Sequence, residues 1–298
     1  MRLLMIIACL YCFDAFATEC SLPLPNQDQT EQVWPYLANI SVSAVFDEPV
    51  TLRAGQFSGA PFVPDGHSRP ELLLWPELLL SADLDGEAGD EKIGLLSETS
   101  GGSGERVYLI VAVDEDGQFR ALPAALLGDR VKVRSMEVRE RQIILRIIEA
   151  GPNQPMCCGT QLSRLNWQIE DGQLVLKERL VEGELSLDAI QGQDWYLLDR
   201  PGDRLNAMHP SCTQLNIQGN RFNMKVNGQT YNGIIDETLP GHIVISDVMP
   251  EVRAADTPDT RLASDLIAVS QYTFRAGRLL FSGKTKERPV NFEFAASP

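Results

Sequence analysis

Carboxylate side chains recur at short intervals in one acidic, glycine-punctuated loop of this chain. They occupy positions one, three, five, eight and nine of the segment 83–91: Asp83, Asp85, Glu87, Asp90 and Glu91. Calcium takes six to eight oxygen ligands, and alternate residues of a tight loop can direct their carboxylates at one ion. The match is partial, because Ala88 stands where a glycine reverses such loops and Gly94 stands at position twelve instead of a glutamate. Two interpretations therefore stay open, a calcium site and a solvated acidic turn.

The first seventeen residues have the pattern of a secretory signal peptide. Arg2 provides the positive charge, Leu3 to Phe13 form the apolar core, and Ala15-Phe16-Ala17 supply the small residues of a cleavage site. This core is too short to cross a bilayer, which takes about 20 helical residues, and no later segment is long and apolar enough to do so. We expect the mature chain to begin near Thr18 and to reside in the periplasm or outside the cell.

Four cysteines remain once the signal peptide is removed: Cys20, Cys157, Cys158 and Cys212. An even number in an exported chain indicates two disulfides, with three possible connectivities. A bridge between the neighbours Cys157 and Cys158 would close a strained eight-membered ring, so we expect one of them to bond to Cys20 and the other to Cys212. Zinc is disfavoured because adjacent thiolates diverge and the three histidines lie far from them in the sequence.

The charge balance narrows the classes of partner. With 26 basic and 41 acidic residues the net charge is −15, which repels nucleic acids and anionic membranes and attracts cations. A basic protein, a cation or a neutral ligand is the partner that this balance favours.

No convergent catalytic set is marked by the sequence. Ser103 lies in Gly101-Gly102-Ser103-Gly104-Glu105, but a nucleophile elbow needs a glycine two positions after the serine, where Glu105 stands. We therefore expect a protein that is not an enzyme.

Turn signals between short apolar runs predict a mainly β or α+β fold in two domains. We expect an extended lead at residues 18–35 within an antiparallel, β-rich domain at 18–180, and a linker at 181–193 that could hold a short helix at 186–191. Within the first domain, the run 107–113 is almost wholly apolar, which is typical of a strand covered on both faces.

The second domain, at 194–298, is expected to be small and α+β with one principal helix. The helix should begin at Asp256 or Thr257 and extend to about residue 270, with Leu262, Leu266, Ile267 and Val269 on one face. Hairpins are expected at 214–226, 231–245 and 272–281, followed by a last strand at 290–294.

Two resemblances to known families follow from motifs. The first domain resembles a module of exported bacterial proteins to which no reaction is assigned, and four motifs carry the resemblance: Ala82-Asp83-Leu84-Asp85-Gly86, Ser100-Gly101-Gly102-Ser103-Gly104, Leu126-Leu127-Gly128-Asp129-Arg130-Val131 and Cys157-Cys158.

The second domain resembles the META domain of HslJ-like envelope proteins. The resemblance rests on an opening tryptophan, a glycine-led strand and a closing aromatic pattern: Trp195, Asn220-Arg221-Phe222, Tyr272, Phe274, Gly277, Leu279 and Phe281. The family's cysteine positions correspond here to residues 226–228 and 247–249, which contain none. The resemblance implies a bacterial periplasmic protein, a loose link to stress or antibiotic tolerance, and no enzyme activity.

Together these observations favour a non-enzymatic periplasmic or secreted protein that binds a ligand or maintains the cell envelope. Two alternatives are an inhibitor that sequesters a cationic protein, suggested by the charge of −15, and a calcium-assisted hydrolase that uses the loop 83–91.

Overall fold

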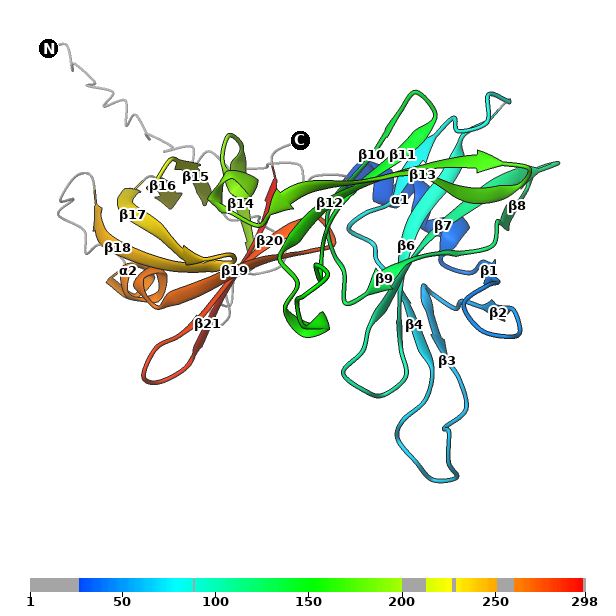
Figure 1. Ribbon diagram of the computed structural model, residues 1–298, viewed down its shortest axis with the longest axis horizontal. Coiled ribbons are helices and arrows are strands. Elements are labelled where there is room, and N and C mark those ends of the chain that lie inside the picture. Colours follow the sequence, from blue (N-terminus) through cyan, green and yellow to red (C-terminus); the bar gives the residue numbers. More distant parts are fainter. Residues whose placement is uncertain (1–26, 88, 200–212, 227–228, 251–259, 297–298) are drawn as a thin grey trace, which may run out of the picture.

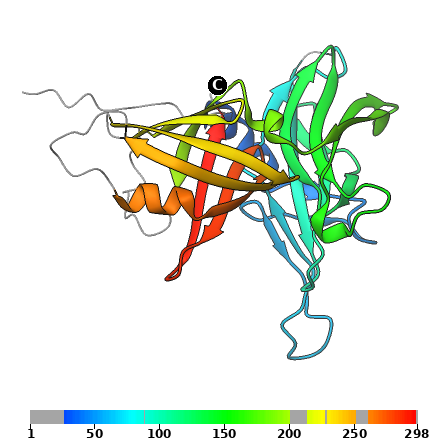
Figure 2. The ribbon, with the colours of Figure 1, turned by 60° about the vertical axis from the view of Figure 1, so that its left-hand side comes forward.

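The computed structural model describes residues 27–87, 89–199, 213–226, 229–250 and 260–296. The expected signal peptide, Cys20, Cys212 and the expected helix start at Asp256 or Thr257 lie outside these residues. The described chain is mainly β and antiparallel, as predicted, and forms two units that lie side by side in both views (Figure 1 and Figure 2).

The first unit is built on a seven-stranded sheet with the order β3-β4-β6-β7-β8, in which β5 pairs with β6 and β9 with β7. Residues Val107 to Ala112 of β7 are all buried, which confirms the prediction of a strand covered on both faces. A separate two-stranded sheet, β1-β2, precedes it. The strands are β1 (Ser41–Val42), β2 (Val50–Thr51), β3 (Gln56–Ser58), β4 (Glu71–Leu74), β5 (Leu80–Ala82), β6 (Glu91–Thr99), β7 (Arg106–Glu115), β8 (Gln118–Ala121) and β9 (Ala125–Asp129).

A four-stranded sheet covers one face of this seven-stranded sheet. Its order is β10-β11-β12-β13, and its inward side chains, such as Leu145 and Leu165, form one apolar cluster with Leu95 and Leu109 of the first sheet. The strands are β10 (Lys132–Arg139), β11 (Gln142–Glu149), β12 (Gln161–Glu170) and β13 (Gln173–Glu184), with a 3-10 turn, η1 (Met156–Cys158), between β11 and β12.

The opposite face of the seven-stranded sheet is covered by helix α1 (Gln27–Leu37). The expectation of an extended segment at 18–35 is therefore wrong for its described part. Val33 and Leu37 lie one helical turn apart and are fully buried in the cluster that includes Leu96 and Ile110. The helix keeps this face buried even though Pro35 lacks the N–H that an interior helical position donates.

The second unit is a closed barrel of eight antiparallel strands in which each strand pairs with the next along the chain. The first strand also pairs with the last, with Trp195 opposite Ala296, which closes the barrel. The pairing between β18 and β19 consists of His242 opposite Gln271. The elements are β14 (Asp194–Asp199), β15 (Gln214–Gln218), β16 (Arg221–Val226), β17 (Gln229–Leu239), β18 (His242–Pro250), α2 (Thr260–Ile267), β19 (Val269–Arg275), β20 (Arg278–Lys284) and β21 (Pro289–Ala296).

The expected principal helix is present and ends earlier than predicted, at Ile267 instead of about residue 270. Leu262 and Leu266 are buried as expected, but Ile267 is 54% exposed and Val269 already belongs to β19, where it pairs with Gly283. The strand pairing ends the helix, because a residue cannot hold helical and ladder hydrogen bonds at once.

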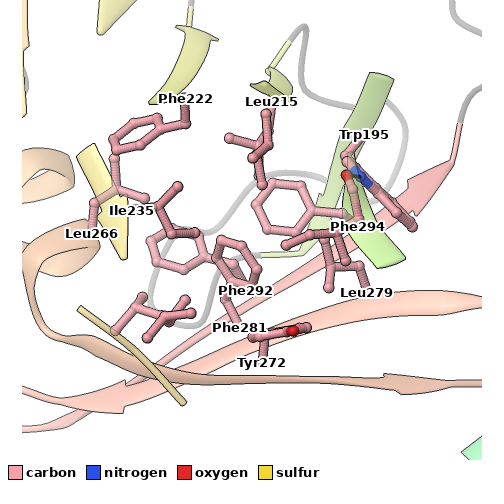
Figure 3. Close-up of a cluster of buried hydrophobic side chains, with 14 of the residues drawn as sticks. Trp195, Leu215, Phe222, Ile235, Leu266, Tyr272, Leu279, Phe281, Phe292 and Phe294 are labelled. Atoms are coloured by element: carbon pink, nitrogen blue, oxygen red, sulfur yellow. Dashed lines mark hydrogen bonds between the residues drawn. The ribbon is translucent and has the colours of Figure 1, made fainter. Parts of the chain in front are cut away.

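Aromatic side chains fill the interior of the barrel (Figure 3). Phe294 lies between two other rings, with centroids 5.5 Å from Phe281 and 6.2 Å from Phe292. Trp195 and Tyr231 are also almost wholly buried. Because large side chains fill the inside of the barrel, a ligand can bind at its outer surface but not in its interior.

The two units are joined by ordered chain and by direct contacts. Strand β13 extends to Glu184, within the expected linker, and the turn η2 (Leu187–Ile190) follows, inside the range where a short helix was expected. Glu237 of the barrel accepts hydrogen bonds from the Leu187 amide at 3.0 Å and the Tyr272 hydroxyl at 2.7 Å. The described helices do not include one of the length and apolar character needed to cross a membrane.

Candidate functional site

The acidic loop connects β5 to β6, and it brings together three of its five carboxylates. The ligand atoms of Asp83, Asp85 and Glu91 all lie within 4.8 Å of one another. Glu87 and Asp90 are exposed and are not in this group. If the loop holds calcium, these three residues supply its side-chain ligands.

Hydrogen bonds to backbone amides give the loop its shape. Asp83 accepts from the Gly86 amide at 2.6 Å and Asp85 accepts from the Glu87 amide at 2.8 Å. Such bonds are typical of Asx turns. Gly86 has a φ of +84°, a left-handed conformation that glycine adopts without strain.

Glu91 is only 4% exposed, and its Oε2 accepts from the Leu84 amide at 2.6 Å. Burial raises the pKa of this carboxyl, partly opposed by the bond from Leu84, and the nearby charge of Asp85 raises it further. A cation placed among these groups would oppose that shift, because it favours the charged carboxylate.

The protein itself supplies one cation here. Arg141, in the turn between β10 and β11, lies 3.6 Å from Asp83 Oδ2, and its guanidinium lies over Gly86, where a β-carbon would collide with it. The contact ties the loop to the four-stranded sheet and partly neutralises it. The geometry accordingly supports both a cation site and an arginine-neutralised turn.

Two of the resemblance motifs meet at the other end of β6. The Glu105 amide donates to Asp129 at 3.2 Å, and the Arg130 amide donates to the Glu105 carbonyl at 2.6 Å. Ser103 is exposed in this loop. The glycine-rich loop and the turn at 126–131 thus form one structural corner, with a hollow of about 240 Å³ beside it.

The cysteine pair lies in the turn η1. The sulfur atoms of Cys157 and Cys158 lie against each other as in a bridge between neighbours, the pairing that the ring-strain argument disfavoured. The expected partners Cys20 and Cys212 lie outside the described residues.

A polar groove on the outside of the barrel was not anticipated from the sequence. It encloses about 390 Å³ over β14 to β17 (Figure 1) and is named here the amide groove. Its outward side chains are Asp194, Gln214, Asn216, Gln218, Arg221, Asn223, Lys225 and Asn232.

Strand register aligns half of these side chains in one row. Asp194 lies opposite Asn216, Asn216 opposite Asn223, and Asn223 opposite Asn232. The sequence does hold a signal, because Gln214, Asn216 and Gln218 alternate with buried Leu215 and Ile217. Only the register shows that the amides of neighbouring strands meet.

Two hydrogen bonds organise the row. Asn216 Nδ2 donates to Asp194 Oδ1 at 2.8 Å, and Asn223 Nδ2 donates to Asn232 Oδ1 at 3.0 Å. Asn216 is thus bonded toward β14 and Asn223 toward β17. At one end, Gln191 holds the β15–β16 turn by accepting from the Gly219 amide at 3.0 Å.

Neither a protein-family model nor a curated protein matches this chain. The two motif resemblances therefore stay predictions, and the functional argument depends on the geometry of the sites.

Proposed function

We propose that this chain is an exported, non-enzymatic binding protein that holds its ligand in the amide groove. The groove itself carries the proposal: eight polar side chains converge over four strands of one closed barrel. Because the barrel interior is packed with aromatic rings, the strands beneath the groove form a rigid platform. Polar groups held on such a platform lose little entropy when a ligand binds.

The signal-like N-terminus supports export to the periplasm or beyond, and the resemblance to HslJ-like proteins supports a role at the cell envelope. A second candidate role is calcium binding by the acidic loop, which the convergence of Asp83, Asp85 and Glu91 favours.

The side-chain amides of the groove allow a direct test. In nuclear magnetic resonance spectra of the mature protein, solubilised envelope material of the source organism should shift the side-chain NH₂ signals of Asn216, Asn223 and Asn232. The signals of Gln271 and Asn291, exposed amides on β19 and β21 of the same barrel, should stay in place.

Shifts confined to residues outside the groove would overturn its assignment as the binding site. Turnover in a broad hydrolase panel that is lost on changing a single acidic residue would overturn the non-enzymatic assignment.

A further inference from the structure

We infer that the amide groove binds an oligosaccharide, with its side-chain amides pairing with sugar hydroxyls. The inference rests on the proposed function and names the ligand class of the same site.

The chemistry of the groove suits hydroxyl groups. A side-chain amide offers two N–H donors and one oxygen acceptor, and a hydroxyl likewise both donates and accepts. The Asn216 NH₂ has one bond to Asp194 among the described residues, which leaves its second N–H and its Oδ1 for a ligand. Asn223 has the same groups left after its bond to Asn232.

The charge of the groove sets it apart from the rest of the chain. One carboxylate, Asp194, stands with two cations, Arg221 and Lys225, and the remaining outward side chains are amides. In a protein whose net charge is −15, this patch is close to neutral. A ligand selected here is held by hydrogen bonds more than by charge.

The row of side chains has the shape of an extended ligand. Neighbouring strands lie about 4.8 Å apart, so the row from Asp194 to Asn232 spans about 14 Å across four strands, the length of a short oligosaccharide. Asn216 and Asn223 bond away from each other, so the middle of the row presents their unused polar groups. Tyr196 lies opposite Gln214 in the register of β14 and β15, and because it stands two residues from Asp194 on the same strand it shares the outer face of the barrel.

Other ligand classes fit less well. A peptide added as a strand needs an unpaired sheet edge, and each of the four groove strands, β14 to β17, is paired on both sides. A nucleic acid needs many phosphate contacts and is repelled by the overall charge, while the cations among the described residues of the groove are Arg221 and Lys225.

The test is isothermal titration of the full mature chain with chitohexaose, cellohexaose, maltohexaose and laminarihexaose. We expect at least one to bind, and Asn216→Ala/Asn223→Ala to weaken its binding by about tenfold, since two neutral hydrogen bonds are lost. The matched control Gln271→Ala/Asn291→Ala, which removes two exposed amides elsewhere on the barrel, should bind as the wild type does. Both side chains changed in the double variant face outward, so its thermal unfolding midpoint should equal that of the wild type. Asn223→Asp is a second groove variant, and it keeps the size of the side chain.

Several results would overturn the inference. One is that no oligosaccharide of the panel binds up to its solubility limit, and another is that binding survives in both groove variants. A third is binding of heparin alone, lost in Arg221→Gln/Lys225→Gln, which would make the groove an anion site. If envelope material shifts the groove amides but no oligosaccharide binds, the carbohydrate inference fails and the proposed function stands.

Discussion

Glu91 shows how a single residue links the acidic loop to the stability of the sheet beneath it. Its carboxylate is buried at the first position of β6 and holds the Leu84 amide, while Asp83 and Asp85 crowd it with like charge. Burial and the neighbouring negative charges favour the protonated form of this carboxyl over the charged form. The stability of the loop and of the sheet beneath it therefore depends on pH through the protonation of Glu91.

The pH dependence of Glu91 has a definite sign. Its pKa in the folded protein is raised above the ordinary value of 4.5, so its stabilising contribution is fully present below pH 4.5 and is lost as pH rises through the folded pKa. Glu91→Gln cannot ionise but can still accept a hydrogen bond from the Leu84 amide. We expect its thermal unfolding midpoint to rise relative to that of the wild type as the pH increases from 4 to 7. Thermal unfolding across this range checks the sign, and a difference that is constant or falls with pH contradicts it.

Calcium and Arg141 should compete for Asp83. We expect millimolar calcium to raise the unfolding midpoint, more so in Arg141→Ala, because a ligand that binds only the folded state stabilises it, by about 2.7 kcal/mol at a hundredfold excess over Kd. Asp85→Asn should abolish the rise. Equal midpoints with calcium and with chelator, in both wild type and Arg141→Ala, would leave the loop as a hydrogen-bonded turn.

At the scale of elements, an ion pair between a buried carboxylate and a half-buried arginine joins α2 to the barrel. Asp265 is 2% exposed, and Arg288, in the β20–β21 connection, reaches its two oxygens at 2.8 and 2.6 Å. Such a pair helps to orient α2, whose eight described residues would be marginal as an isolated helix.

The two partners of this pair should not be equivalent. Arg288→Met removes two hydrogen bonds from a buried carboxylate, whereas Asp265→Asn leaves an arginine that can turn to solvent. We expect losses of unfolding free energy of about 3 kcal/mol for Arg288→Met and about 1 kcal/mol for Asp265→Asn. Urea denaturation measures both losses, and an equal or reversed order would contradict this prediction.

Elements with a clear apolar period could be predicted, and those held by long-range contacts could not. The hairpins at 214–226, 231–245 and 272–281 are present as β15–β16, β17–β18 and β19–β20, because turn residues and alternation encode them locally. Helix α1 was missed because its buried face consists of few residues, chiefly Val33 and Leu37, in a polar segment with Pro35. The amide groove was missed because the alternating polar side chains of a single strand do not predict a groove. The groove follows only from the register of the four strands β14 to β17, which the sequence does not show.

At the scale of the molecule, the two units share a buried junction. The Arg134 guanidinium of β10 lies 5.2 Å from the Phe274 ring centroid and donates to the Ala189 carbonyl at 3.1 Å. The Gly277 amide, in the β19–β20 turn, donates to the Val133 carbonyl at 2.9 Å. The units are therefore expected to unfold together.

Calorimetry can show whether the two units unfold together or separately. We expect one unfolding transition in the wild type and two in Arg134→Ala, since the variant loses a cation–π contact worth about 1–2 kcal/mol together with the bond to Ala189. Arg139→Ala, a change at an exposed arginine of the same strand, should keep the single transition. Two transitions in the wild type would show that the junction does not couple the units.

The pairing of β14 with β21 also has a consequence for synthesis. Trp195 meets Ala296, so the ring of strands closes only when β21 is free to pair with β14. While the ribosome still holds that segment, the nascent chain carries β14 with an open edge, and this unit cannot finish folding. A deletion within residues 289–296 would therefore disturb the first strand of the barrel as much as the last.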